Sequence, residues 1–189
     1  MTFMLDLKKI DDHWTLFLDR DGVINYEKKD GYILKPDEFV FYPGAPEAIG
    51  FFSTLFRNII LITNQRGIGK GLMTENDLTN IHRHMLASIH RANGRIDKIY
   101  HCSSIDDHDP MRKPNPGMAL LAKKDFPSIE FSKTIMVGNN ISDMLFARNV
   151  GEIKSVFLST TDPDIKLPHP AVDLSFTDLP AFAKALQLK

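Results

Sequence analysis

The chain has 189 residues, of which 43% are hydrophobic and 25% are charged. This composition is that of an ordinary globular protein and excludes a disordered or low-complexity chain. The 23 Lys and Arg residues nearly balance the 24 Asp and Glu residues, which gives a formal net charge of −1. This balance argues against attraction of the whole surface to nucleic acid or to an anionic membrane, so we expect neither as a partner. The length predicts one domain over residues 1–189.

Cysteine use and the N-terminal residues bear on the compartment. Cys102 is the single cysteine, so it cannot form an internal disulfide. Asp6, Lys8 and Lys9 interrupt the apolar stretch that a signal peptide needs. The longest apolar runs, such as residues 59–62, are far shorter than the roughly 20 residues that cross a bilayer. We therefore expect a cytoplasmic protein that is a monomer or a weak homo-oligomer.

Short apolar runs alternate along the chain with helical patterns. The runs are nearly continuous in apolar character, which is typical of parallel strands covered on both faces. We expect strands at residues 15–18, 59–62, 99–102, 135–137 and 155–158. We expect helices at residues 45–56, 75–92, 118–124, 142–149 and 178–188, and a surface loop over residues 160–173. The alternation predicts an α/β fold with a mostly parallel sheet.

The helix expected at residues 75–92 carries the clearest signals. Thr74 and Asp77 have the spacing of a capping box, and Gly94 suits the C-terminal cap. Four apolar residues at helical spacing share one face: Leu78, Ile81, Met85 and Ile89. Three histidines of the same helix are expected to be solvated or packed: His82, His84 and His90.

Ligands of α/β proteins bind outside the carboxyl ends of the strands, so the residues after each apolar run are the candidates for chemistry. The first such segment is DRDGVIN, in which Asp19 and Asp21 are two residues apart and point to the same side of an extended chain. One carboxylate can act as a nucleophile while its neighbour exchanges protons, and the pair suits Mg²⁺. An ordinary Asp-Gly turn is the alternative. A calcium loop is excluded, because Gly22 falls at the fourth loop position and Val23 stands where a ligand is needed.

The second segment is TNQRGIGKG, residues 63–71. The Thr63 hydroxyl and the amides after it could hold a phosphate oxygen. Neither common nucleotide motif fits, because Gly71 follows Lys70 where a Walker A loop needs Ser or Thr, and Leu72 occupies the last glycine position of the Rossmann pattern. Taken alone, the segment is typical of a glycine-rich loop.

Two further segments follow later strands. In RKPNPGM, Pro114 restricts Lys113 to extended backbone, from which a lysine can place its charge on phosphate; a solvated surface lysine is the alternative. In GNNISDM, Asn139 and Asp143 are four residues apart and could face one turn of a helix. Their oxygens could complete a metal shell, and an Asn-rich turn is the alternative.

The order of these segments is more specific than any one of them. The chain has a pair of Asp residues, then Thr, then Lys, then an acidic cluster, each after a predicted strand. This order resembles the four motifs of the haloacid dehalogenase superfamily of phosphohydrolases. The resemblance extends from about residue 15 to residue 188. TNQRGIGKG and RKPNPGM are similar to the subgroup of D-glycero-D-manno-heptose 1,7-bisphosphate phosphatases and histidinol-phosphatases. The resemblance implies a Rossmann-like three-layer α/β/α fold, and the segments 25–45 and 71–74 are too short for a sizeable cap domain.

The resemblance also implies roles for individual residues. Asp19 would attack phosphorus and form an aspartyl-phosphate. Asp21 would protonate the leaving oxygen and then activate water. Thr63 and Lys113 would hold the phosphoryl oxygens. Substrate contacts are implied for Lys29, Asp30, Gly31, Tyr32, Asn64, Gln65, Arg66 and Arg112.

A magnesium site is part of the same resemblance. Its ligands would be Asp19, the backbone carbonyl of Asp21, Asn139 and Asp143. The superfamily pattern has Asp where this chain has Asn139. A neutral amide oxygen still coordinates Mg²⁺ but leaves more positive charge uncompensated, so we expect reduced affinity.

The subgroup also carries a zinc loop of Cys and His, which this chain lacks. The stretch HCSSIDDHDPMRKP contains His101, Cys102 and His108 but not the paired ligand spacing. A structural zinc site needs about four protein ligands, so we expect no zinc.

The pattern as a whole indicates a Mg²⁺-dependent phosphomonoester hydrolase. The expected substrate is a small sugar phosphate similar to heptose 1,7-bisphosphate, and histidinol phosphate is an alternative. A different alternative is a phosphate-binding protein whose catalysis is impaired by Asn139. The intact residues Asp19, Asp21, Thr63 and Lys113 argue against that loss.

Overall fold

The computed structural model describes residues 5–161 and 165–189. Its sheet has six parallel strands in the order β3-β2-β1-β4-β5-β6. The strands are β1 (Thr15–Leu18), β2 (Asn58–Asn64), β3 (Lys98–Cys102), β4 (Thr134–Gly138), β5 (Lys154–Leu158) and β6 (Leu174–Phe176). The helices are α1 (Ala45–Leu55), α2 (Arg66–Gly69), α3 (Glu75–Arg91), α4 (Gly117–Asp125), α5 (Ile141–Val150) and α6 (Leu179–Gln187).

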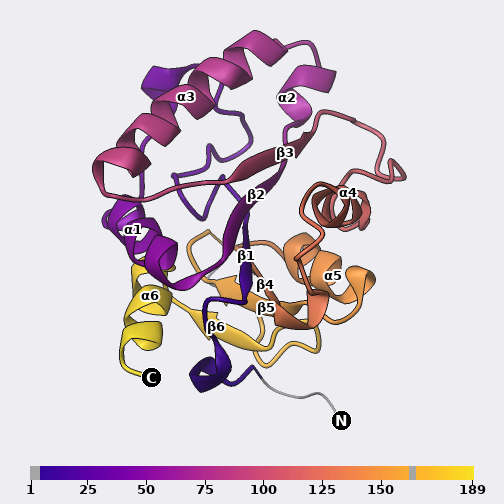
Figure 1. Cartoon of the computed structure of the whole chain (residues 1–189). Coiled ribbons are helices and arrows are strands. Elements are labelled where there is room, and N and C mark those ends of the chain that lie inside the picture. Colours follow the sequence, from indigo (N-terminus) through magenta and orange to yellow (C-terminus); the bar gives the residue numbers. More distant parts are fainter. Residues whose placement is uncertain (1–4, 162–164) are drawn as a thin grey trace.

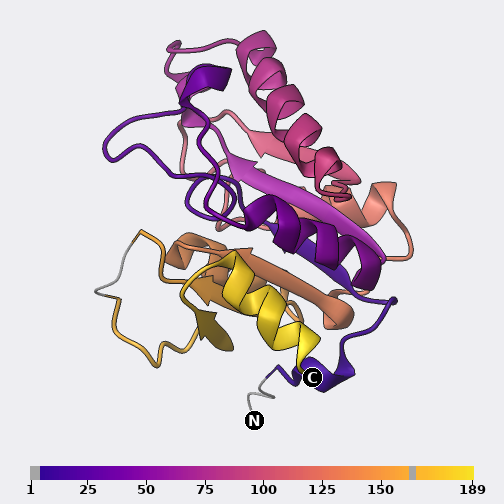
Figure 2. The same ribbon diagram turned by 90° about the vertical axis from the view of Figure 1, so that its left-hand side faces the viewer.

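Alternation of side chains along each strand builds two cores, one on each face of the sheet. Leu16 and Leu18 of β1 belong to the core that includes buried residues of α1, α3 and α6. Phe17 points the other way and packs with buried residues of α4 and α5. Figure 1 shows the resulting three layers, and Figure 2 shows α1 and α6 side by side on one face. The predicted three-layer α/β/α fold is therefore confirmed.

The signals of α3 act as its sequence predicts. The Thr74 hydroxyl accepts a hydrogen bond from the N–H of Asp77, and the Asp77 carboxylate accepts one from the N–H of Thr74. This capping box satisfies two of the free N–H groups at the helix start. All four residues of the predicted apolar face are buried: Leu78, Ile81, Met85 and Ile89.

Short elements account for the differences from the expected pattern. The three-residue strand β6 begins just after the expected loop 160–173, of which residues 162–164 lie outside the described part. The four-residue helix α2 lies within the segment expected to be a glycine-rich loop. Elements this short contain too few residues to show the apolar periodicity from which a helix or strand is predicted. Among the described residues, no helix is long and apolar enough to cross a membrane.

The sheet places the ends of β1, β2 and β4 next to one another. Leu18 of β1 pairs in register with Leu61 of β2 and Val137 of β4. Between β1 and α1, where every residue is described, the one helical element is the 3-10 helix Pro36–Glu38. The carboxyl edge of the sheet is therefore covered by loops and the short helix α2, as expected for a fold without a sizeable cap.

Candidate active site

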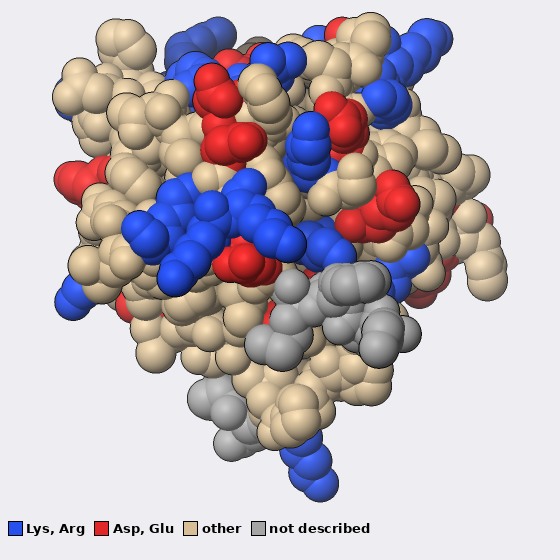
Figure 3. Space-filling model, turned by 60° about the horizontal axis from the view of Figure 1, so that its bottom comes forward, with Lys and Arg blue, Asp and Glu red and all other residues tan. Residues whose placement is uncertain are grey.

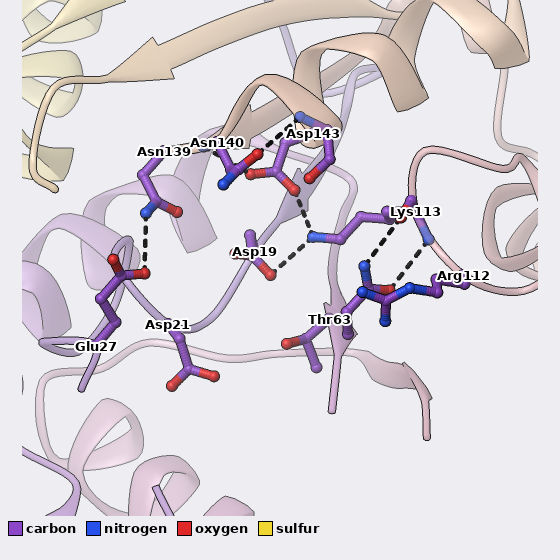
Figure 4. Close-up of a pocket in the computed structure, with 11 residues that line it drawn as sticks. Asp19, Asp21, Glu27, Thr63, Arg112, Lys113, Asn139, Asn140 and Asp143 are labelled. Carbon is purple, nitrogen blue, oxygen red and sulfur yellow. Dashed lines mark hydrogen bonds and ion pairs between the residues drawn. The ribbon is translucent and has the colours of Figure 1, made fainter. Parts of the chain in front are cut away.

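A hollow of about 220 Å³ lies at the carboxyl ends of β1, β2 and β4. All four sequence motifs contribute side chains to it (Figure 4). Its lining consists of Asp19, Asp21, Glu27, Thr63, Asn64, Arg112, Lys113, Asn139, Asn140, Ser142 and Asp143. The structure thus brings together the predicted catalytic and metal-binding residues, which are up to 124 positions apart (143 − 19) in the chain.

Lys113 links three of the motifs. Its Nζ lies 2.8 Å from Asp19 Oδ1 and 2.6 Å from Asp143 Oδ1, and its side chain is only 2% exposed. Burial alone would lower the pKa of Lys113, but the carboxylates of Asp143 and Asp19 outweigh it and raise that pKa above its usual value. Lys113 is therefore a fixed positive charge, and the alternative of a solvated surface lysine is wrong.

Asn64 holds the backbone of Lys113. Its side-chain amide donates to the carbonyl of Lys113 at 3.0 Å and accepts from its N–H at 3.1 Å. Asn64 also lines the hollow, so this contact leaves its predicted role toward substrate open. The pair of hydrogen bonds ties the end of β2 to the third motif.

Asp19 follows β1 directly. Its N–H donates to the carbonyl of Val137 on β4 at 3.0 Å, which fixes the backbone where the two strands end. Loss of water around its carboxyl raises the pKa of Asp19 to about 7, and the ammonium of Lys113 only partly opposes this rise. The carboxyl also lines the hollow, so it faces an open space.

Asp21 is anchored by three side chains. Arg20 donates to its Oδ2 at 2.7 Å, Asn25 to its Oδ1 at 2.9 Å and Gln65 to its Oδ2 at 3.0 Å. Burial alone would raise the pKa of Asp21, but Arg20, Asn25 and Gln65 together lower it below its usual value. Gln65 also donates to the Thr63 hydroxyl at 2.9 Å, so it joins the second motif to the first.

Arg20 is a functional candidate that the sequence interpretation missed. Its side chain is fully buried, and its Nη1 lies 3.2 Å from Nε2 of His82 on α3. The signal in the sequence is its position directly after a buried apolar run: a charged side chain that is buried there needs partners, which are Asp21 and His82.

Asn139 lies directly after β4, and its amide has a defined orientation. Its Nδ2 donates to the Thr161 hydroxyl at 2.6 Å and lies 3.4 Å from Glu27 Oε2. Gly22, at φ 81°, packs so closely that a Cβ there would lie 2.0 Å from Nδ2. The Oδ1 of Asn139 is buried and has no hydrogen-bond partner among the described residues. Glu27 and Thr161 are further contacts that the sequence pattern did not indicate.

Asn140, not Asn139, begins the helix of the fourth motif. Its side chain caps α5, and its N–H donates to Asp143 Oδ2 at 3.1 Å. The predicted metal ligand Asp143 therefore has both carboxylate oxygens engaged, one by this N–H and one by Lys113. Asn139 lies before the helix, so it does not share a helical turn with Asp143.

The residues predicted to contact substrate divide between neighbouring hollows. Gly31 and Tyr32 line a hollow of about 170 Å³ that also borders Asp21 and Gln65. Lys29 and Asp30 line another of about 590 Å³. Their contacts with substrate remain predictions.

Arg66 and Arg112 converge on one carboxylate. Arg66 pairs with Asp107, and Arg112 Nε donates to the same Asp107 Oδ1 at 3.0 Å. Arg112 borders the central hollow, whereas Arg66 lies on α2 and is not one of the residues that line it. Two guanidinium groups thus stand near the mouth of the site, where an anion could replace the exposed carboxylate.

The residues considered for zinc have other surroundings. Cys102 is buried in the core between the sheet and α4, and His101 pairs with Glu75 at 2.9 Å. Among the described residues, three His, Cys, Asp or Glu ligand atoms within 4.8 Å of one another occur in an exposed group before β1: Asp11, Asp12 and His13. This group is at the opposite edge of the sheet from the hollow, and the absence of zinc remains a prediction.

The sequence is similar to those of known phosphatases. A D-glycero-alpha-D-manno-heptose-1,7-bisphosphate 7-phosphatase of Campylobacter jejuni is 42% identical over 131 residues, which are 68% of this chain and 73% of that protein. A D-glycero-beta-D-manno-heptose-1,7-bisphosphate 7-phosphatase of Helicobacter pylori strain J99 is 35% identical over 156 residues, 82% of this chain and 87% of that protein.

A solved structure is similar over nearly the whole chain. The D,D-heptose 1,7-bisphosphate phosphatase of B. bronchiseptica, complexed with magnesium and phosphate, superimposes with a TM-score of 0.82 at 28% identity, covering 93% of this chain and 98% of that one. These matches confirm that the protein is an enzyme of the predicted phosphatase class. Residues 2–151 match the family of haloacid dehalogenase-like hydrolases, and the chain belongs to that family.

Proposed function

We propose that this protein is a Mg²⁺-dependent phosphatase that hydrolyses a heptose 1,7-bisphosphate through an aspartyl-phosphate on Asp19. The observation that carries the proposal is the position of Asp19: its carboxylate faces the hollow at 2.8 Å from a buried lysine. The names of the relatives from C. jejuni, H. pylori and B. bronchiseptica support the substrate class.

The residues of the site fit a magnesium ion. Asn139 offers a buried amide oxygen without a hydrogen-bond partner, and Asp19 offers a carboxylate in the same hollow. Oxygen atoms of this kind are what Mg²⁺ prefers. We assign Asp19, the backbone carbonyl of Asp21 and Asn139 as its ligands. Bound there, the ion supplies Lewis-acid stabilisation of the phosphoryl oxygens.

Asp143 receives a different assignment, because its two oxygens are engaged. It orients Lys113 through one oxygen and caps α5 through the other. Lys113 in turn neutralises charge on the phosphoryl group. The Thr63 hydroxyl donates a hydrogen bond to a phosphoryl oxygen. Fixed donors of this kind stabilise charge that develops in the transition state.

The first chemical step forms the phosphoenzyme. An oxygen of Asp19 bonds to phosphorus while the bond from phosphorus to the sugar oxygen breaks, and the proton of Asp21 passes to that oxygen. Because Asp21 has a lowered pKa, it is ionised in the free enzyme. The anionic phosphate beside it favours the protonated form that this step needs.

The second step returns the enzyme to its starting state. Asp21, now ionised, takes a proton from water as the water oxygen bonds to phosphorus. The bond between phosphorus and Asp19 breaks, inorganic phosphate leaves, and Asp21 then releases its proton to solvent. Enzymes accelerate phosphate-monoester hydrolysis by up to about 10²¹-fold, whereas acid–base help alone gives roughly 10²–10⁴-fold, so the covalent step and the fixed cations must supply the rest.

We assign Arg112 and Arg66, which both pair with Asp107, to the second phosphate of a bisphosphate. Arg112 borders the hollow next to Lys113, and guanidinium groups match phosphate geometry in a bidentate manner. On the face in Figure 3, Lys and Arg side chains gather beside Asp and Glu side chains. Because Arg112 and Lys113 both line the hollow, the site suits a small anionic substrate.

The test is a substrate comparison with purified full-length protein and Mg²⁺. The alpha and beta anomers of D-glycero-D-manno-heptose 1,7-bisphosphate and histidinol phosphate are assayed for phosphate release, with Asp19→Asn as the control. We expect hydrolysis of a heptose bisphosphate, its abolition by EDTA, and none in D19N. Preference for histidinol phosphate would favour the alternative substrate, and binding without turnover would favour an impaired phosphate-binding protein.

A further inference from the structure

His82 is a buried polar residue that the reaction scheme above does not use. It lies on α3, whose capping box and buried residues Ile81 and Met85 fix the helix against the core. His82 itself is 8% exposed, and its Nε2 faces Arg20 Nη1 at 3.2 Å. A side chain of α3 thus reaches Arg20 in the first motif.

Arg20 is held on two sides. Its Nε and Nη2 donate to the Asp21 carboxylate at distances of 3.2 and 2.7 Å, while Nη1 points to His82. The guanidinium is planar and rigid, so contacts at both ends fix the plane in which it meets the carboxylate. The ring of Phe39 lies 5.9 Å from the guanidinium carbon and restricts its remaining movement.

The chemistry of the contact sets the form of the histidine. An arginine only donates hydrogen bonds and does not lose its proton in proteins. Nε2 of His82 must therefore accept, so the ring is neutral and carries its proton on Nδ1. A histidine in this form supplies a hydrogen-bond acceptor to Nη1 of a fully buried cation, since the Arg20 side chain is 0% exposed.

We propose that His82 is a positioning residue for the reaction: by accepting a hydrogen bond from Arg20, it holds the guanidinium in the plane that orients the Asp21 carboxylate. The inference rests on the proposed function of Asp21 in proton transfer. Small displacements of a catalytic group are costly, and about 1 Å can lower a rate by about 100-fold. His82 therefore acts on catalysis from the opposite side of the arginine.

The experiment compares variants that differ in hydrogen bonding. His82→Leu removes the acceptor at similar size, His82→Asn retracts it, and His82→Gln restores an acceptor oxygen near the Nε2 position. His90→Leu makes the same change on an exposed position of the same helix and is the matched control. Each variant is assayed with heptose bisphosphate and with p-nitrophenyl phosphate, and thermal unfolding is followed in parallel.

The two substrates separate positioning of Asp21 from general damage. The sugar alkoxide needs a proton to leave, whereas p-nitrophenolate leaves without one. We expect H82L and H82N to lower kcat/KM for the sugar phosphate by about 10- to 100-fold. Their kcat/KM for p-nitrophenyl phosphate stays close to wild type. This ratio reports only the steps up to phosphoryl transfer to Asp19, and the later hydrolysis of the phosphoenzyme, which needs Asp21 as a base, does not enter it. H82Q and H90L stay close to wild type with both substrates.

Three results would overturn the inference. One is an unchanged kcat/KM for the sugar phosphate in H82L and H82N. Another is an equal loss with both substrates, which would indicate a structural role. The third is a loss in H82Q as large as in H82L. If H82L does not fold, H82N and H82Q decide the same question. Failure of the proposed function is distinct, because wild-type protein would then hydrolyse neither substrate in a manner that depends on Asp19.

Discussion

Lys113 lies between two carboxylates, and its contact with Asp143, at 2.6 Å, is shorter than its contact with Asp19, at 2.8 Å. The other oxygen of Asp143 is held by the N–H of Asn140, so Asp143 is fixed at both oxygens, whereas Asp19 lies at the hollow directly after β1. The sequence pattern predicts both acidic residues as metal ligands, but their roles differ in the structure. Asp143 holds the Lys113 ammonium, and Asp19 is the residue that reacts.

Replacing Lys113 tests this separation. Lys113→Met removes the charge at similar length and leaves two buried carboxylates without their partner. We expect turnover to fall by at least about 100-fold and the free energy of unfolding to fall by about 3 kcal/mol. Measurements of kcat and of urea unfolding check both effects.

The double variant K113M/D143N is the matched control for stability. It removes one of the two stranded charges but supplies no cation, so stability returns in part while turnover stays low. Recovery of turnover in the double variant, or wild-type turnover in K113M, would contradict the role of Lys113.

The pH dependence of kcat/KM follows from Asp19. Its pKa is raised to about 7, and the protonated carboxyl cannot attack phosphorus. With p-nitrophenyl phosphate, whose leaving group needs no proton from Asp21, kcat/KM should therefore rise with pH up to about 7 and then level off. Because a bound cation favours the ionised carboxylate, higher Mg²⁺ concentration should move this limb to lower pH. A profile that is flat from pH 5 to 8, or that falls through this range at every Mg²⁺ concentration, would contradict the assignment.

Position 139 sets the charge of the metal site. Asn139→Asp replaces a neutral ligand oxygen with an anionic one and should strengthen Mg²⁺ binding by about tenfold. Isothermal titration of the protein with MgCl₂ measures the change. Glu27, 3.4 Å from the Asn139 nitrogen, would then face a second carboxylate. The double variant E27Q/N139D keeps the wild-type charge and separates the effect of charge from that of ligand type. No change in either metal affinity or rate in N139D would refute the idea that Asn139 weakens the site.

Arg112 is expected to act on binding more than on chemistry. Arg112→Gln removes a charge-assisted contact to the second phosphate and should raise KM for the bisphosphate by about tenfold, with a smaller change in kcat. A substrate with a single phosphate should show a smaller effect. Arg91→Gln, an exposed change on α3, serves as the control. An equal rise in KM for both substrates would show that Arg112 does not bind the second phosphate.

The fold and the reacting residues follow closely from the sequence for a physical reason. The strands β1, β2 and β4 are runs of buried residues, and three residues of the site stand where these runs end. Asp19 and Asn139 directly follow β1 and β4, and Thr63 lies near the end of β2, so parallel topology alone brings them together.

The residues that hold the site in place are less visible in the sequence. Arg20 meets His82 across 62 positions, and Asn139 meets Glu27 across 112. Contacts at such separations depend on how helices and loops pack over the sheet, and neither spacing nor periodicity encodes them. The same is true of β6, since its three residues are placed by pairing with β5.

Detection of a phosphoryl group on Asp19 tests the central claim most directly. The variant Asp21→Asn is mixed with p-nitrophenyl phosphate and Mg²⁺, because this leaving group needs no proton whereas hydrolysis of the phosphoenzyme needs the missing base. Acid quenching and peptide mass spectrometry should then find one added phosphoryl group on the peptide that contains Asp19. Continued release of p-nitrophenolate from a protein that stays unmodified, or modification at another residue, would contradict the account.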